Sequence, residues 1–498
     1  MNYKYDIVII GSGFSGLMCG AILSKHGYSV CVLEKQSTPG GNLQTFKRHG
    51  KVFNTGLHYL GALKKGQTLY KIFKYLGLLD RITLDQLNPN CFDRVFIGDK
   101  EYCHASGFEN YEKNLLAYFP AEADSIKKYV EKIQEVWKSN PFLNFKTIEK
   151  GERIVQAFEN EGLMDVMNSL FTNEELKALL LANNGLYAGD PARTPFYVHA
   201  LINSLFIQSA FTIRGGSHLL AEALVEIIQE QNGVVLTKKE VVKIHTEELQ
   251  TKYVVTEDGS KIFGDSFFSS VHPKVSISWF EKGVFRKPFV NRINKLANTI
   301  GSFVLYVSLK EKTFPHLNAN VYYSKSDDVW GAVYTPEEWP KSSILYTTRD
   351  EENPDFAESA TIITFMDYSE VEQWKDPASR KLNSNYKQFK DEKAQKLIGK
   401  IETKFPNFRE NIESYFSSTP LTYIDYTGIP EGSMYGIAKD YKNKMGTYLP
   451  LSTRVSNFYL TGQSIGIHGV MGVSMNAILA SATQVDINKL VKEIKEVE

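Results

Sequence analysis

The sequence predicts an α/β protein with a nucleotide-type βαβ unit at its N-terminus and a second, discontinuous α+β domain. Three observations support this prediction. A buried strand, a glycine-rich turn, a helix and a second strand follow one another within residues 6–34. A mainly helical stretch then interrupts the pattern, and similar strands return after Gly215 and near the C-terminus. At 498 residues the chain is also too long for one hydrophobic core, so two associated domains are expected.

The N-terminal unit consists of a strand at 6–10, a helix at 15–26 and a strand at 29–34. The turn between them reads Gly11-Ser12-Gly13-Phe14-Ser15-Gly16. The first glycine allows the tight turn, the second lets the backbone approach a pyrophosphate, and the third lets helix and strand pack closely. Glu34 follows Gly11 by 23 residues, at the end of the next strand, where its carboxylate can accept from both ribose hydroxyls. Together these features indicate a dinucleotide site.

The remaining elements follow in order. Residues 63–210 are predicted to be mainly helical, with clear amphipathic stretches at 127–136 and 174–181. Gly215 precedes a helix at 218–231, and strands follow at 234–236, 241–245, 253–256 and 267–271. A sheet domain is expected from strands at 303–309, 344–347 and 361–365 with a Lys-rich helix at 386–405, before a strand at 457–461 and a helix from 472. The chain therefore returns to the nucleotide domain at its end.

A second glycine pair follows the acid. After Glu34 and Lys35 come Gly40, Gly41 and Asn42, where backbone amides can approach the cofactor again. This second approach favours FAD over NAD.

The segment from Glu34 to Gly41 resembles the Glu-x(5)-Gly-Gly extension of the amine oxidase and phytoene desaturase flavoproteins. Gly41 to Phe46 and Thr55 to Gly61 resemble the branch that contains retinol saturase and carotenoid isomerase. Later segments of that branch are matched by residues 215–217 with Val241, by 419–436 and by 460–472. The resemblance extends over most of the chain.

The resemblance implies a Rossmann-like FAD-binding domain of the glutathione reductase type. That domain would comprise residues 1–62, 211–282 and 450–498, and the substrate-binding domain residues 63–210 and 283–449. Val241 would meet the adenine through its backbone, Gly462 and Gln463 would lie along the ribityl chain and pyrophosphate, and Val470 and Met471 would approach the flavin ring. The full set of expected cofactor residues is Gly11, Ser12, Gly13, Ser15, Gly16, Glu34, Lys35, Gly40, Gly41, Asn42, His58, Val241, Gly462, Gln463, Val470 and Met471.

Two residues depart from the family pattern. Asn42 replaces a commoner basic residue, and Asn54 stands where an acid usually precedes Thr-Gly, so phosphate contacts there are expected from the backbone. The C-terminal part has no cysteine to form a thioether, so the FAD is expected to be non-covalent. Because no second Gly-x-Gly-x-x-Gly unit follows, an external electron donor or acceptor is expected.

His58 and His468 are the catalytic candidates, because the family places both segments beside the flavin and imidazole exchanges protons near neutral pH. The alternatives are a structural histidine bonded to backbone for His58 and a turn-shaping residue for His468. Tyr59 is a weaker candidate that is better explained by packing. Independently of family, a helix that begins at 469–472 would stabilise negative charge on a reduced flavin.

The apolar stretch at 194–211 is interrupted by polar residues, which argues against a transmembrane helix. Its side chains either line a tunnel for a long apolar substrate or form an ordinary core helix; they are Phe196, Tyr197, His199, Phe206 and Phe211. A soluble enzyme that takes a lipid substrate must dock at a membrane, and the surface at 137–145 is the segment suggested for this contact.

The charge balance and the cysteines limit the class of protein. Fifty-seven basic and fifty-seven acidic residues give zero net charge, which argues against nucleic acid as a partner. The four cysteines have neither a disulfide pattern nor metal spacing, so a reducing compartment and no metal are expected. The chain begins directly with a strand and has no room for a signal peptide, which predicts a cytoplasmic protein that docks peripherally at a membrane.

The leading hypothesis is an FAD-dependent oxidoreductase that saturates, desaturates or isomerises carbon–carbon double bonds of an apolar polyene or isoprenoid. An amine oxidase or a porphyrinogen oxidase is the alternative enzyme. A lipid-carrying flavoprotein with a vestigial redox site is the non-enzymatic alternative.

Overall fold

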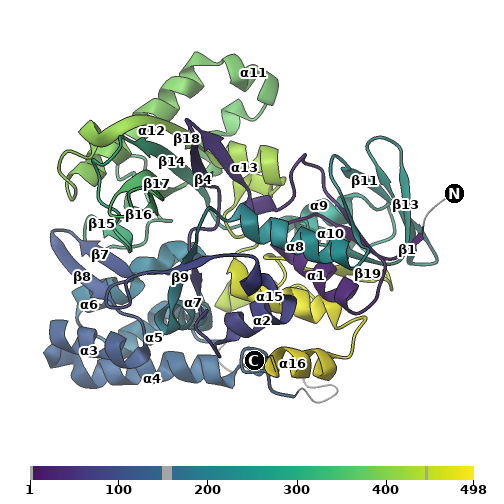
Figure 1. The fold of residues 1–498 in the computed structure, drawn as a ribbon, viewed down its shortest axis with the longest axis horizontal. Helices are drawn as coiled ribbons and strands as arrows, with labels where there is room; N and C mark the ends of the chain where they lie inside the picture. The colour runs from purple at the N-terminus through teal and green to yellow at the C-terminus, as the bar shows by residue number, and fades with distance from the viewer. Residues whose placement is uncertain (1–3, 148–159, 444–446, 498) are drawn as a thin grey trace.

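A computed structural model describes residues 4–147, 160–443 and 447–497 (Figure 1). Two seven-stranded sheets form its framework. In the first sheet the strand order is β10-β2-β1-β13-β12-β11, with β19 also beside β13. Its strands are β1 (Lys4–Ile10), β2 (Val30–Leu33), β10 (Val234–Leu236), β11 (Val241–Glu247), β12 (Gln250–Thr256), β13 (Lys261–Ser269) and β19 (Phe458–Leu460).

The centre of the first sheet is parallel, because β1, β2, β10, β13 and β19 all run in one direction. Strand β1 is buried on both faces: Ile7 and Ile9 join one hydrophobic core, and Val8 and Ile10 join another. This explains why its sequence is a continuous apolar run.

Helices cover both faces of this sheet. The core with Ile7 and Ile9 also holds side chains from α1 (Phe14–Lys25), α8 (His218–Glu230) and α15 (Gly469–Ser481). The core on the other face takes side chains from α9 (Pro273–Ser278) and α10 (Lys287–Lys295). The first sheet is therefore the middle layer of a three-layer α/β domain.

The second sheet has the order β18-β14-β17-β16-β15-β7-β8 and is antiparallel except between β15 and β7. Its strands are β7 (Asp93–Ile97), β8 (Lys100–His104), β14 (Gly301–Leu309), β15 (Asn320–Ser324), β16 (Ser342–Arg349), β17 (Ala357–Met366) and β18 (Ile412–Ser418). Two small sheets join β3 (Thr45–Arg48) to β4 (Lys51–Asn54), and β5 (Leu60–Gly61) to β9 (Ala210–Ile213) and β6 (Leu84–Gln86).

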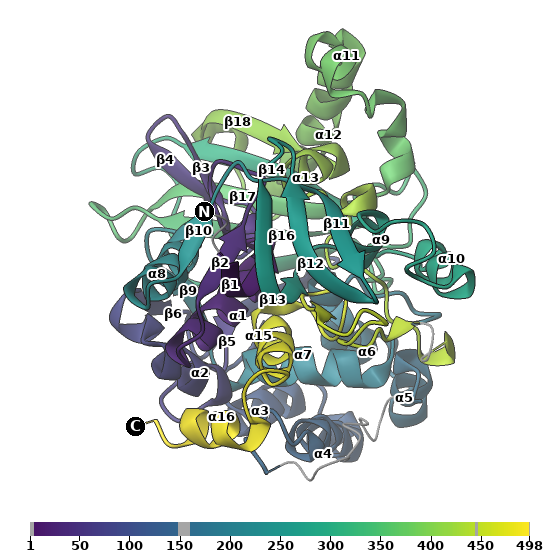
Figure 2. The same ribbon diagram turned by 90° about the vertical axis from the view of Figure 1, so that its right-hand side faces the viewer.

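The second sheet lies between two groups of helices, which Figure 2 shows at opposite ends of the molecule. One group consists of α11 (Pro377–Leu382) and α12 (Ser384–Glu402), and α12 packs on one face of the sheet. The other group lies against the opposite face and consists of α3 (Phe108–Tyr118), α4 (Ala123–Ser139), α5 (Leu163–Leu170), α6 (Glu174–Leu181) and α7 (Phe196–Gln208). The remaining helices are α2 (Thr68–Leu76), α13 (Pro420–Thr427) and α16 (Ile487–Lys495).

The predicted α/β fold is confirmed, and one part of it needs correction. The stretch 63–210 was expected to be mainly helical, but it also contributes the hairpin β7–β8 to the edge of the second sheet. The alternation of Val95 and Ile97 toward the helices with Phe96 toward α12 is visible only once the sheet exists. The division into domains at residues 62, 210, 282 and 449 stays a proposal.

Candidate functional site

The turn after β1 forms one wall of a deep cavity of about 370 Å³ between the two sheets. Helix α1 begins at Phe14 with Gly13 as its N-cap, and no side chain caps its first amides. A Cβ on Gly16 would lie 2.0 Å from the Gly11 carbonyl oxygen, so only glycine permits this helix–strand contact. A Cβ on Gly13 would meet nothing within 4 Å, because this position faces the cavity.

Glu34 holds this turn in place. One carboxylate oxygen, Oε2, accepts from the Ser12 amide at 3.0 Å and from the Ser12 hydroxyl at 2.5 Å, and Oε1 accepts from the Gln36 amide at 2.8 Å. Glu34 also lines the cavity, whereas Ser12 is fully buried and does not line it. The acid thus orients the glycine turn and still presents oxygen atoms to a ligand.

The second glycine pair lies beside the first turn, since Gly40 and Gly13 form a β-bridge. Asn42 follows on the cavity wall, and its Oδ1 is buried without a hydrogen-bond partner among the described residues. Asn54 has a different role: its Oδ1 accepts from the Ser217 amide and hydroxyl, at 2.8 and 2.9 Å. An orphaned amide oxygen on the cavity wall indicates that a ligand completes this site.

The C-terminal segment forms the opposite wall. Asn476 donates to the carbonyl oxygens of Gly462 and Ile467, both at 3.1 Å, and so fixes the loop before α15. Helix α15 begins at Gly469 without a side-chain cap, and Gly469 and Val470 line the cavity. Two uncapped helix N-termini therefore face one cavity, an arrangement that stabilises anionic groups.

Twelve of the expected cofactor residues line this cavity together: Gly11, Gly13, Ser15, Glu34, Lys35, Gly40, Gly41, Asn42, Val241, Gly462, Gln463 and Val470. Four lie behind the wall. Ser12 and Gly16 support the turn, Met471 is packed in the core, and His58 stacks on Tyr346 instead of lining the cavity.

The profile of the family described as flavin-containing amine oxidoreductase matches residues 14–483. The chain belongs to this family. As a flavin-containing oxidoreductase it requires a site for a flavin, and the described residues fit one: Asn42 Oδ1 lacks a partner, Gly13 leaves open space, and two helix N-termini are uncapped.

Relatives that act on polyenes, by their names, align with most of this flavin-containing oxidoreductase. It is 28% identical to all-trans-retinol 13,14-reductase of Homo sapiens, over 96% of this chain and 85% of that protein. It is 22% identical to prolycopene isomerase 2 of an Oncidium hybrid cultivar, over 96% of this chain and 83% of that protein. It is 24% identical to the 4,4'-diapophytoene desaturase of a Methylomonas species, over 63% of each chain.

Solved structures share the fold. An oxidoreductase from Methanosarcina mazei superposes with a TM-score of 0.63 at 15% identity, covering 95% of this chain and 99% of that one. Cyclohexylamine oxidase from Brevibacterium oxydans superposes with a TM-score of 0.61 at 14% identity, covering 99% of each chain.

His58, the first catalytic candidate, stacks on Tyr346 with ring centroids 4.3 Å apart and planes 5° apart. Its Nε2 is buried and has no hydrogen-bond partner in the part of the chain that is described. Burial lowers the pKa of His58 to about 4, so the imidazole is neutral at pH 7.

His468 is held more firmly. Its Nε2 donates to the Leu186 carbonyl oxygen at 3.1 Å, and its ring stacks on Tyr435 with centroids 4.2 Å apart. Burial lowers the pKa of His468 to about 4, although the bond to Leu186 opposes the shift. These contacts agree with the structural alternative for His468, and catalytic roles for both histidines stay proposals.

Sequence reasoning missed the wall that the second sheet and α13 contribute. It consists of Ser302, Ile363, Tyr423, Tyr426, Met434 and Tyr435. Tyr423 donates to the Thr55 carbonyl oxygen at 3.1 Å, and Tyr435 donates to the Gly185 carbonyl oxygen at 3.0 Å. Tyr423, Tyr426, Met434 and Tyr435 fall within the segment 419–436 that resembles the family, but nothing in that segment assigned them to the cavity. Ser302 and Ile363 come from separate strands, so no local pattern signals them.

The proposed tunnel residues belong to the core. Phe196, Tyr197, His199 and Phe206 of α7 are buried, and the cavity is lined by neither these four nor Phe211. The His199 ring hydrogen-bonds to the hydroxyls of Tyr129 and Tyr187, at 2.8 and 2.9 Å. These contacts agree with the alternative of an ordinary core helix, because the polar side chain of His199 finds its hydrogen-bond partners inside the helical layer.

The surface at 137–145 is also not available for membrane contact, since its large apolar side chains are buried: Trp137, Phe142, Leu143 and Phe145. They pack into the core beside α4, which the local sequence does not indicate. Among the described residues, no helix combines the length and the apolar character needed to cross a membrane.

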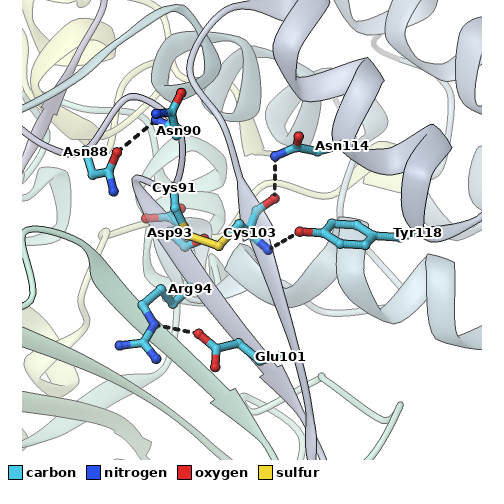
Figure 3. Close-up of a disulfide and its surroundings, with 9 residues drawn as sticks. All are labelled: Asn88, Asn90, Cys91, Asp93, Arg94, Glu101, Cys103, Asn114 and Tyr118. Carbon is cyan, nitrogen blue, oxygen red and sulfur yellow. Dashed lines mark hydrogen bonds and ion pairs between the residues drawn. A yellow bond between two sulfur atoms is a disulfide. The ribbon is translucent and has the colours of Figure 1, made fainter.

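The cysteine prediction needs correction too. Cys91 and Cys103 form a disulfide at the open end of the β7–β8 hairpin, while Cys19 and Cys31 are buried free thiols (Figure 3). From α3, Asn114 donates to the Cys103 carbonyl oxygen and Tyr118 accepts from the Cys103 amide. The expectation of a reducing compartment rested on four free thiols and loses that support.

Proposed function

We propose that this flavin-containing oxidoreductase binds FAD non-covalently and adds hydrogen to a carbon–carbon double bond of an apolar polyene. The observation that carries the proposal is the similarity to all-trans-retinol 13,14-reductases, which extends over 96–97% of this chain and 85–86% of those proteins. Desaturation or isomerisation of the same bonds is supported by the desaturase and isomerase relatives.

The cavity supports an apolar substrate over an amine. Its wall includes the apolar side chains of Leu57, Ile363 and Met434. The acids among the described lining residues are Glu34 and Glu240, and both belong to the nucleotide end. An ammonium substrate would therefore lack a carboxylate partner, whereas a polyene needs none.

Non-covalent binding is supported by the positions of the cysteines. None of the four, all of which are described, lines the cavity. When bound, FAD would supply the two-electron chemistry, and the residues of the glycine turns, Asn42 and the two helix N-termini would hold it. An external electron donor or acceptor and a peripheral, cytoplasmic location on a membrane surface are part of the same proposal.

The test is to incubate the FAD-loaded protein with all-trans-retinol and dithionite without oxygen. The expected product is heavier by two hydrogen atoms, as measured by mass spectrometry after chromatography. Acid denaturation should release all flavin into the supernatant. Peroxide formation with amines and no conversion of polyenes would favour the amine oxidase alternative instead.

The lipid-carrying alternative is separated by a second measurement. If reduced protein binds retinol but never transfers electrons to retinol, a carotenoid or a quinone, then the chain is a carrier. Retinol binding is followed by quenching of tryptophan fluorescence, and electron transfer by the return of oxidised-flavin absorbance.

A further inference from the structure

Helix α10 and the loop before it carry an exposed cluster of positive charge, although the total charge of the chain is zero. Residues 274–295 contain six basic residues and one acid. Five of the basic side chains are exposed and constitute the basic surface: Lys282, Arg286, Lys287, Arg292 and Lys295. Figure 2 shows α10 at the right-hand edge of the molecule, next to α9. Positive charge is therefore concentrated at one edge of the protein.

The cations of the basic surface are not neutralised within the fold. The one acid of the segment, Glu281, pairs with Lys243 at 3.0 Å. None of the five cations has an ion-pair partner within residues 4–147, 160–443 and 447–497. Arg454 adds another exposed cation, since its guanidinium donates to the Val284 carbonyl oxygen at 3.3 Å. An anionic partner would therefore meet unpaired charges here.

Apolar side chains lie among these charges. Phe285 and Ile293 are buried and attach this segment to the core on the α9–α10 face of the first sheet. Val284 and Phe289 pack against the same core and stay half-buried. The Arg292 guanidinium lies over the Phe289 ring, 5.6 Å from its centroid. Cations that surround partly exposed apolar side chains on a short helix are typical of segments that lie at the surface of an anionic membrane.

A second cavity, of about 90 Å³, lies where the chain leaves α10. Asn298 lines it, three residues after the end of the helix, and accepts from His272 at 2.9 Å. Val333 also lines it and is 49% exposed, so the cavity reaches the surface. His468 lines it too, and the His468 ring stacks on Tyr435, which lines the large cavity. A surface opening therefore lies beside the basic surface, and a stacked pair of rings lies between this second cavity and the large one.

We propose that the basic surface docks on an anionic lipid membrane and places the second cavity next to the bilayer. The inference rests on the proposed function, because an apolar polyene partitions into lipid and its enzyme meets it there. Each unpaired cation within a Debye length of an anionic leaflet adds to the attraction, so docking requires anionic lipid and weakens with salt. The half-buried Val284 and Phe289 favour lipid over nucleic acid, which would need only the charges.

Flotation of the FAD-loaded protein with vesicles tests the proposal without any substrate. The wild-type protein should bind phosphatidylcholine vesicles that contain about a third phosphatidylserine, and roughly 0.5 M salt should release it. It should not bind vesicles of phosphatidylcholine alone. The α10 variant should bind the anionic vesicles roughly a hundredfold more weakly or less. It combines Arg286→Gln, Lys287→Gln, Arg292→Gln and Lys295→Gln.

The matched control removes the same number of exposed charges from α3 and α4. It combines Lys113→Gln, Lys127→Gln, Lys128→Gln and Lys138→Gln. This control should bind anionic vesicles like the wild type. Both variants should keep the wild-type flavin content and melting temperature, because every replaced side chain is exposed.

Turnover of all-trans-retinol separates docking from chemistry. When retinol is supplied in anionic vesicles, the α10 variant should turn over roughly tenfold more slowly than the wild type. When retinol is supplied in a neutral detergent, the two proteins should have the same rate. A loss of equal size in detergent would overturn the proposal, because it would place the effect in the catalytic site.

Three vesicle results would also overturn the proposal: a wild-type protein that binds no vesicles, one that binds neutral vesicles as tightly as anionic ones, or an α10 variant that binds like the wild type. Loss of binding by the α3–α4 control alone would place docking on those helices instead. Binding of duplex DNA without binding of anionic vesicles would assign the basic surface to nucleic acid. A protein that docks but converts no polyene would contradict the proposed function alone.

Discussion

The two seven-stranded sheets contribute to the cavity through different kinds of atoms. The first sheet presents backbone: the turn at Gly11 and Gly13 and the uncapped amides of α1. The second sheet presents side chains: Ser302 and Ile363 lie on the wall, and Tyr322 and Tyr346 are buried in the core on the helical side of the sheet. The residues that form the nucleotide turn are therefore close together in the sequence. The rest of the cavity wall depends on which strands of the second sheet pair.

The largest effect is expected from a substitution in the glycine turn of the first sheet. Gly16→Val should yield protein with less than about a tenth of the normal flavin and a lower melting temperature. The reason is that its side chain would overlap the Gly11 carbonyl, where even a Cβ lies at 2.0 Å, and overpacking costs about 1–3 kcal/mol or more. Flavin absorbance per protein and thermal unfolding measure the two effects.

Gly13→Ala is the matched control, because a Cβ there meets nothing within 4 Å. It should melt like the wild type but bind flavin more weakly, since the methyl group projects into the cavity. A Gly16→Val protein with full flavin content would show that helix–strand contact does not decide nucleotide binding.

The next largest effect concerns two buried histidines, His104 and His199, on the helical side of the second sheet. Burial lowers the pKa of His104 to about 4 and that of His199 to about 3. Since the unfolded chain binds protons near pH 6.5, the contribution of each histidine is complete above that pH and is lost as the pH falls toward 4. Each should cost roughly 3 kcal/mol of unfolding free energy at pH 4, as measured by urea unfolding.

His104→Leu sharpens this prediction, because its Nε2 has no partner to lose among the described residues. The variant should lose less stability between pH 6.5 and pH 4 than the wild type. If the unfolding free energy of the variant falls between pH 6.5 and pH 4 as steeply as that of the wild type, His104 is already protonated or exposed in the folded protein.

The smallest effect should come from the edge of the second sheet. Replacing both Cys91 and Cys103 by Ser should lower the unfolding free energy by about 3 kcal/mol or less, because the disulfide closes a short loop. Flavin content should stay unchanged, since the hairpin lies away from the nucleotide turn. Denaturant unfolding of the variant is compared with that of the oxidised and the reduced wild-type protein. Loss of flavin from the variant would contradict the conclusion that this edge of the second sheet does not contribute to nucleotide binding.

Much of the fold and of the cofactor site was predictable. The strand at 234–236 and the helix at 174–181 have the bounds that the pattern predicts, and the glycine turns with Glu34 line one cavity. These features depend on residues close together in sequence, where periodicity and glycine placement carry the information. The hairpin at 93–104 was missed because its short alternating strands are stable only against the rest of the second sheet.

The sequence by itself determined the α/β class, the dinucleotide turn and the family. Only the tertiary structure decided that α7 is core, that Cys91 pairs with Cys103, and that the buried Asp93 pairs with Asn320. The physical reason is the range of the interactions involved. A helix N-terminus and a glycine turn are built by neighbouring residues, whereas burial, and the pKa shift that follows from it, depends on every element packed around a side chain.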